Sequence, residues 1–142
     1  MSRREDVLAA IKALVVAALP SADVERNRSK AKSIGPGGTV LIEDGDPGEP
    51  EIDLSPLSYN YVHRVPLMVG GYASASLTDA QVLDAMLTAI GAAVMADRTL
   101  GGLCDFLETE APDGSALEVA GAEPGRQCEA AIIAHYSTPS PL

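Results

Sequence analysis

The sequence predicts a single α+β domain spanning residues 1–142, α/β only in the loose sense, in which two helices pack on a mostly antiparallel sheet. Its 142 residues are close to the usual size of one domain and too few for two domains that each bury a core. Two segments show apolar residues at helical spacing, whereas the other apolar segments alternate or are short. The strands come in blocks instead of alternating one for one with helices, which favours an antiparallel sheet over a doubly wound one.

Both helices are predicted from apolar periodicity and from capping residues. In residues 2–19 a serine is followed three positions later by a glutamate, as in a capping box, and Pro20 then stops the helix. In residues 78–98, Thr78 and Gln81 repeat that spacing ahead of a second apolar stripe. We expect two amphipathic helices that each bury one side.

Three strands are expected between the helices. They run from Val24 to Lys32, from Thr39 to Glu43 and from Ser58 to Tyr72. In the longest strand, alternate residues share one face; these are Tyr59, Tyr61, Val65, Leu67 and Val69. Pro66 cannot donate a ladder hydrogen bond, so we expect an edge position or a bulge there.

Three more strands are expected after the second helix. Phe106 to Glu110 and Ala116 to Val119 flank a turn at Pro112 to Ser115, and Glu129 to Tyr136 closes the chain as a final strand. The predicted element order is therefore α-β-β-β-α-β-β-β.

Two segments rich in proline and glycine, at about 33–38 and 44–57, are expected to be exposed loops. They hold four of the ten prolines and five of the thirteen glycines. Such segments are usually mobile and lie on the surface. A long loop without secondary structure is uncommon in a small domain and tends to be functional or disordered.

The charge balance limits the classes of partner. Twenty acids against ten bases give a net charge of -10, which makes nucleic acid a poor candidate for a broad surface partner, although a local basic patch stays possible. Apolar runs such as Leu14 to Leu19 are shorter than the roughly 20 residues that a membrane span needs. Because Glu5 and Asp6 precede the first apolar run, it predicts a helix and not a signal peptide, so we expect a cytosolic protein without membrane contact.

No catalytic, metal or cofactor motif is recognisable. Cys104 and Cys128 lie 24 residues apart, without a CxxC motif or clustered histidines, so we expect reduced thiols. His63 and His135 have no nucleophile or carboxylate at a suggestive spacing, and we expect packed or surface histidines. Gly35 to Gly38 lacks the Lys-Ser/Thr of a phosphate-binding loop. We therefore expect no cofactor, no metal and no enzyme.

Charge patterning is the most informative feature. If Val24 to Lys32 is a strand, four basic side chains project from one face of it. These are Arg26, Arg28, Lys30 and Lys32. Six acids follow in a loop that lacks EF-hand spacing and is interrupted by prolines, so calcium is the weaker interpretation. They are Glu43, Asp44, Asp46, Glu49, Glu51 and Asp53.

Two interpretations of this pattern remain open. The basic ribbon is either an edge strand protected from aggregation by its charges or one half of a subunit contact. In the second case the acidic loop of one copy meets the ribbon of the next, head to tail, and closes a ring. We expect the loop to point away from the ribbon of its own chain.

The layout resembles the tail terminator proteins of long-tailed phages, prophages and gene-transfer agents, the lambda minor tail protein U class. The shared features are the N-terminal helix, the basic strand, the acidic Pro/Gly loop, the long strand Tyr59 to Val69, the helix Thr78 to Arg98 and the ending Ala134 to Thr138. The resemblance implies a hexameric ring that caps the tail tube and docks the head connector. DNA would pass through its lumen without specific binding, in a virion tail or neck assembled in the host cytoplasm.

Two other functions stay open on the residues alone. A cytosolic module could bind a ligand on a surface formed by Tyr59, Tyr61 and Tyr72. A small transferase acting on a thioester would have to use one of the two cysteines together with a histidine.

Overall fold

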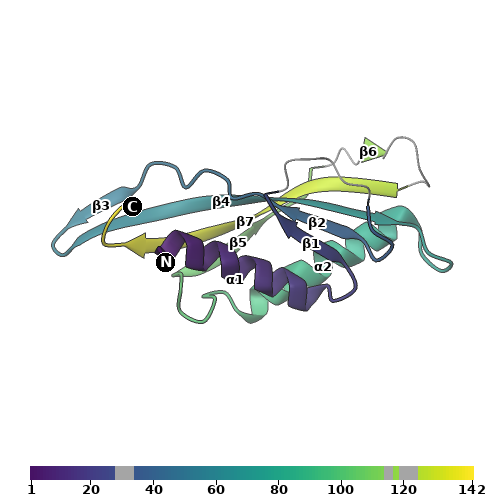
Figure 1. Ribbon diagram of the computed structural model, residues 1–142, viewed down its shortest axis with the longest axis horizontal. Coiled ribbons are helices and arrows are strands. Elements are labelled where there is room, and N and C mark those ends of the chain that lie inside the picture. Colours follow the sequence, from purple (N-terminus) through teal and green to yellow (C-terminus); the bar gives the residue numbers. More distant parts are fainter. Residues whose placement is uncertain (28–33, 114–116, 119–124) are drawn as a thin grey trace.

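The computed structural model of the chain describes residues 1–27, 34–113, 117–118 and 125–142. Two helices lie against one side of a sheet whose strands continue well beyond them (Figure 1). The elements in chain order are α1 (Arg3–Ala18), β1 (Asp23–Arg26), β2 (Thr39–Ile42), β3 (Glu51–Leu54), β4 (Leu57–Tyr72), α2 (Asp79–Ala96), β5 (Phe106–Glu110), β6 (Leu117–Glu118) and β7 (Gly125–Thr138). The predicted α+β class is confirmed, with one more strand before α2 than expected.

The sheet is built around two long antiparallel strands. β4 pairs with β7 along all 14 residues of β7, from Tyr59 opposite Thr138 to Tyr72 opposite Gly125. The strand order is β1-β2-β4-β7-β5, with β3 on the free end of β4 and β6 on β7. Among the described strands only β1 and β2 run parallel, so the prediction of a mostly antiparallel sheet is correct.

Alternation along β4 shows which face carries the core. Tyr61, Val65, Leu67 and Val69 are buried, as their predicted common face requires, and His63 is buried between them. The residues between them point to the other face, where Val62 and Met68 are exposed. The described elements thus form two layers, with helices on one face of the sheet and the other face open to solvent.

The helices close the core from one side. Each helix buries four apolar side chains: Val7, Leu8, Ile11 and Val15 from α1, and Leu83, Met86, Ile90 and Val94 from α2. The Thr78–Gln81 capping box forms in both directions, whereas at Ser2 only the backbone N–H of Glu5 is capped. α2 is long and apolar enough to cross a membrane by length and composition, and in this structure its four buried side chains pack into the core.

The first predicted strand is shorter than expected. β1 ends at Arg26, and Asn27 follows with φ of 53°, a left-handed conformation that ends a strand. The expectation of one continuous strand from Val24 to Lys32 is therefore wrong at Asn27, and of the four basic residues only Arg26 lies on the strand that the structure describes. Arg28, Lys30 and Lys32 lie outside the described residues.

Both predicted loops contain structured residues. Ile34 is buried, so the segment at about 33–38 is not simply an exposed loop. Within 44–57, the alternating sequence Glu51–Leu54 forms β3 and pairs with the beginning of β4. Gly45 has φ of +69°, and a Cβ there would collide with the Arg64 carbonyl oxygen, so this chain segment crosses β4 closely.

Pro66 lies in a central strand, neither at an edge nor at a described bulge. Its carbonyl accepts the Glu43 N–H at 3.0 Å, so its nitrogen faces the same side, just past the last pair of β2, Ile42 with Leu67. The bond that Pro66 cannot donate is therefore the return bond to the Glu43 carbonyl, at the place where the pairing of β2 with β4 ends.

The two predicted strands around the turn at Pro112 do not pair with each other. β5 and β6 both run antiparallel to β7, with Glu110 opposite Ala131 and Leu117 opposite Gln127. Because β4 occupies the whole of the other edge of β7, β5 and β6 follow one another along the same free edge. The two strands are therefore not the arms of one hairpin.

Candidate functional site

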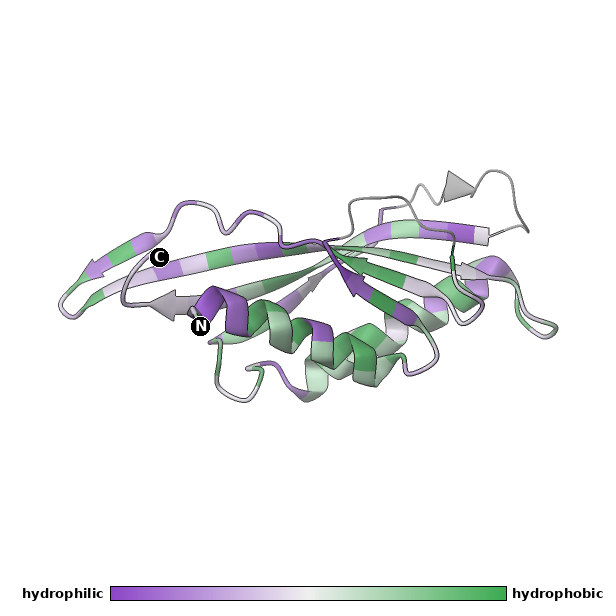
Figure 2. Ribbon diagram, in the orientation of Figure 1, coloured by the Kyte–Doolittle hydropathy of each residue, from purple (hydrophilic) through white to green (hydrophobic). Residues whose placement is uncertain are grey.

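The most distinctive surface feature is a hairpin that extends past the helices. It consists of β3 and the first residues of β4, joined at Ser55-Pro56 by a cis peptide bond (Figure 1). We call residues 51–58 the arm. All four residues of β3 are exposed, and Figure 2 shows hydrophobic and hydrophilic residues alternating along it.

The arm carries large apolar side chains that nothing in the described chain covers. Leu54 is 82% exposed, Ile52 is 53% exposed and Leu57 is 48% exposed. Burying such a side chain is worth about 1.5–3 kcal/mol, so a protein gains stability by hiding it and gains nothing from extending it into water. An apolar projection of this kind indicates a contact with another macromolecule.

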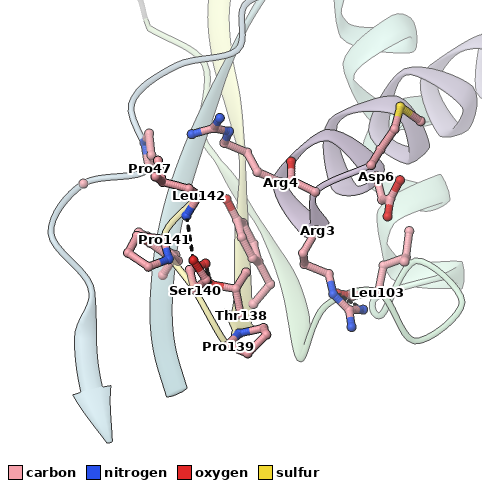
Figure 3. Close-up of a pocket in the computed structure, with 15 residues that line it drawn as sticks. Arg3, Arg4, Asp6, Pro47, Leu103, Thr138, Pro139, Ser140, Pro141 and Leu142 are labelled. Atoms are coloured by element: carbon pink, nitrogen blue, oxygen red, sulfur yellow. Dashed lines mark hydrogen bonds between the residues drawn. The ribbon is translucent and has the colours of Figure 1, made fainter. Parts of the chain in front are cut away.

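A pocket lies near the base of the arm, where both ends of the described chain meet. Its volume is about 550 Å³, and its lining includes the start of α1, the loop at Pro47, Tyr61 of β4 and Tyr136 of β7. Figure 3 shows Arg4 extending from α1 toward the side where Pro47 and Leu142 lie, while Arg3 turns to Leu103. The Arg3 guanidinium donates to the Leu103 carbonyl at 3.2 Å.

Two tyrosines of the pocket wall, Tyr61 and Tyr136, contact each other, and Tyr136 also contacts the buried His63. The rings of Tyr61 and Tyr136 stack with their centroids 5.7 Å apart. Nδ1 of His63 lies 2.9 Å from the Tyr136 hydroxyl, and Nε2 lies 2.6 Å from the Asp44 carbonyl oxygen. A carbonyl only accepts, so Nε2 carries the proton and the tyrosine donates to Nδ1.

The predicted interface residues that the structure describes divide into three groups: Arg26 with Asp44, Glu43 with Asp46, and Glu49 with Glu51 and Asp53. Arg26 pairs within its own chain, with Glu5 at 2.7 Å and Asp44 at 2.6 Å. The expectation that the acidic segment points away from Arg26 is therefore wrong, because Asn27 and the end of β2 bring Asp44 beside it. Glu43 and Asp46 follow β2, and the Asp46 side chain caps the Gly48 N–H at 2.8 Å.

The third group is exposed on or beside the arm. Glu49, Glu51 and Asp53 form no ion pair with any described cation. The only described partner of the Asp53 carboxylate is the Asn60 amide at 3.0 Å. These acids remain candidates for a contact with another molecule.

The cysteines and His135 form no nucleophilic constellation in the described chain. Cys104 and Cys128 are buried free thiols, and burial raises the pKa of Cys104 to about 11 and raises that of Cys128. A thiol with a raised pKa is a poor nucleophile near neutral pH. His135 stacks on Phe106 and bonds Glu108 at 3.0 Å on the open face of the sheet.

Neither the apolar side of the arm nor the pocket was predicted from the sequence. The alternation of Glu51, Ile52, Asp53 and Leu54 is a period-two signal, but the flanking prolines and glycines masked it. The pocket is lined by residues from both ends of the described chain, and no spacing pattern in a sequence reports such a juxtaposition.

No protein-family model matches the sequence, and no curated protein matches it as a relative.

Proposed function

We propose that the protein is a structural subunit that assembles into a ring, which ends the tube of a phage-like tail and joins it to the head connector. The observation that carries this proposal is the arm, whose apolar side chains are held out in solvent on a paired, extended hairpin. A hairpin alone is marginally stable in water, so an exposed one is maintained for a contact it makes. A contact that leaves from one end of a subunit is suited to repetition around a ring.

The two layers of the fold support the same proposal. The helices use one sheet face for the core, and the other face presents a mixed surface that includes Val62, Met68 and Phe106. A tail subunit must contact neighbours in its ring as well as proteins above and below it. The arm and the open face offer two separate surfaces for these contacts.

The mass in solution and the shape of the particles test this proposal. We expect the purified protein to be monomeric or weakly associated when dilute and to form closed rings at high concentration, visible by negative-stain electron microscopy. Light scattering should show a mass that rises with concentration and reaches a plateau. A dimer with two-fold symmetry at every concentration contradicts the ring, since such an interface pairs one patch with itself.

The neighbouring genes test the tail assignment separately from the ring. We expect the gene that encodes this chain to lie among genes for tail tube and head connector proteins. A location among genes of small-molecule metabolism contradicts a role in a tail.

A ligand-binding module is the second candidate, favoured by the pocket of about 550 Å³. Pockets of this size hold small ligands, and Tyr61 and Tyr136 provide an aromatic wall. A protein that stays monomeric at high concentration and binds a small anion at Arg4 supports this candidate over the ring.

A further inference from the structure

The cations without a carboxylate partner are concentrated on α1. Among the described residues, Arg26, Arg64 and Arg126 each pair with a carboxylate. Four described cationic side chains form no ion pair with a described acid: Arg3, Arg4 and Lys12 on α1, and Arg98 after α2, whose guanidinium donates to the Leu107 carbonyl. In a chain with a net charge of -10, two adjacent arginines left without acids are a local positive site.

Two of these cations line the pocket beside α1. Arg3 and Arg4 contribute to its wall, and Asp6 is the one lining residue with a carboxylate side chain. The opposite wall is formed by Tyr61, Tyr136 and the prolines near the end of the described chain. A ligand that fits this pocket has an apolar side and an acidic side.

The arm has this two-sided chemistry. Side chains alternate along a strand, so Ile52 and Leu54 point to one face of the arm while Glu51 and Asp53 point to the other. From Glu43 to His63 the sequence contains no lysine or arginine. A ribbon with one apolar and one acidic face matches a pocket with one apolar wall and one wall of arginines.

The arm does not reach the pocket of its own chain. Leu54 is 82% exposed at the tip, and Figure 1 shows the tip extending away from the start of α1. Arm and pocket are therefore two different patches of one molecule. When the arm of one copy binds the pocket of another, the pair still has one free arm and one free pocket. Further copies can therefore add through the same contact, which gives a closed ring or an open filament.

We propose that the arm of one copy docks in the pocket beside α1 of the next copy, with Glu51 and Asp53 facing Arg3 and Arg4 and with Leu54 against the tyrosine wall. This contact rests on the proposed ring and names the surfaces that build it. It replaces Arg26 as the basic side of the contact, because Arg26 is already occupied by Glu5 and Asp44.

Single charge reversals with matched controls test the contact. Arg4→Glu and Asp53→Lys should each raise the concentration at half assembly by about tenfold or more, because like charges meet at the interface. Lys12→Glu, on the same helix outside the pocket lining, and Asp84→Lys, on the exposed side of α2, change the charge equally and should stay within about twofold of the wild type. Sedimentation velocity measures the assembly, and thermal unfolding confirms that each variant is folded.

Two further experiments distinguish a direct contact from a general charge effect. The double variant Arg4→Glu with Asp53→Lys should recover most of the assembly, because the pair is restored with reversed sign. Equal mixing of the two single variants should also recover assembly, with the two variants alternating, because each arm then meets a pocket of opposite charge, in the wild-type combination at one contact and in the reversed combination at the next. Arg4→Gln provides a milder variant if Arg4→Glu unfolds.

The outcomes separate the contact from the proposed function. If the wild type never assembles, both the ring and the contact are wrong. If the wild type assembles and Arg4→Glu or Arg4→Gln assembles equally well, the contact is wrong while the ring stands. If Leu54→Asp blocks assembly and Arg4→Glu does not, the arm docks elsewhere, for instance in the apolar groove that Leu14, Ala93 and Leu100 line, and this proposal is overturned.

Discussion

His63 illustrates how much a single buried residue organises at one end of the core. It is fully buried, and its two ring nitrogens reach the Asp44 carbonyl and the Tyr136 hydroxyl, 19 and 73 residues away in sequence. Both hydrogen bonds are satisfied by one neutral tautomer. Burial lowers the pKa of His63, and the charge of Arg4 adds to the lowering, while the hydrogen bond to the Asp44 carbonyl and the carboxylates of Asp44 and Asp46 act in the opposite direction.

The lowered pKa of His63 predicts a loss of stability in mild acid. The unfolded chain takes up a proton at this histidine near its ordinary pKa of 6.5, and the folded chain does so only at lower pH. The free energy of unfolding should therefore fall as the pH drops below about 6.5. Urea unfolding measured at pH 7.5 and pH 5.5 checks this expectation.

A histidine variant identifies the source of that pH dependence. His63→Gln should be less stable at pH 7.5, by about 1–3 kcal/mol, because the amide cannot reproduce both hydrogen bonds in the same space. Its stability should change less between pH 7.5 and 5.5 than that of the wild type. An unchanged slope in this variant assigns the effect to another group and contradicts the prediction for His63.

At the scale of elements, Arg26 joins three parts of the chain. Its guanidinium holds Glu5 in the first turn of α1 and Asp44 after β2, from the last residue of β1. These contacts lower the pKa of both carboxyls, for which the hydrogen bond to Arg26 is the main cause. A residue expected to face another subunit is thus an internal connection between elements.

Arg26 and Arg64 offer a matched comparison of a half-buried and an exposed ion pair. The Arg26 side chain is 18% exposed, whereas that of Arg64, which pairs with Glu110 on the open face, is 44% exposed. Arg26→Gln should lower the free energy of unfolding by about 1–2 kcal/mol, and Arg64→Gln by less than about 1 kcal/mol. Chemical denaturation at neutral pH measures both, and equal losses would show that Arg26 is no more than a surface charge.

The strand of the arm was not predicted, because the prolines and glycines on both sides of it indicate a loop. Glu51–Leu54 alternates as strands do, but it lies between a proline-glycine segment and Pro56. Its partner is the beginning of β4, only a few residues further on. A hairpin so short and so exposed gains little from burial, and therefore lacks the apolar run by which the other strands are recognised.

For the whole molecule, the two-layer arrangement predicts that neighbouring residues of β4 differ sharply in their tolerance to substitution. Val65 is fully buried, and Val62 is 59% exposed on the open face. Val65→Thr should lower the free energy of unfolding by about 1–3 kcal/mol because it buries a hydroxyl, while Val62→Thr should stay within about 0.5 kcal/mol. Denaturant unfolding compares the two, and a large loss at Val62 contradicts an open sheet face in the monomer.

The sequence by itself determined the class of fold and the positions of its main elements. Both helices, the long strand β4 and the strand Phe106–Glu110 were predictable, because periodicity and capping are local properties of a chain. It also indicated that the acidic segment was a candidate interface, since charge density is visible without a structure.

Only the tertiary structure decided which of those residues face one another. The pairing of the strands places Asp44 beside Arg26, so this arginine forms its ion pair within the chain. Arg3 and Arg4 lie instead at a pocket lined by residues from both ends of the described sequence. The physical reason is that hydrogen bonds and ion pairs depend on distances of a few ångströms between residues far apart in the chain. Local patterns carry no information about those distances, so the arm and its candidate receptor emerged only from the folded arrangement.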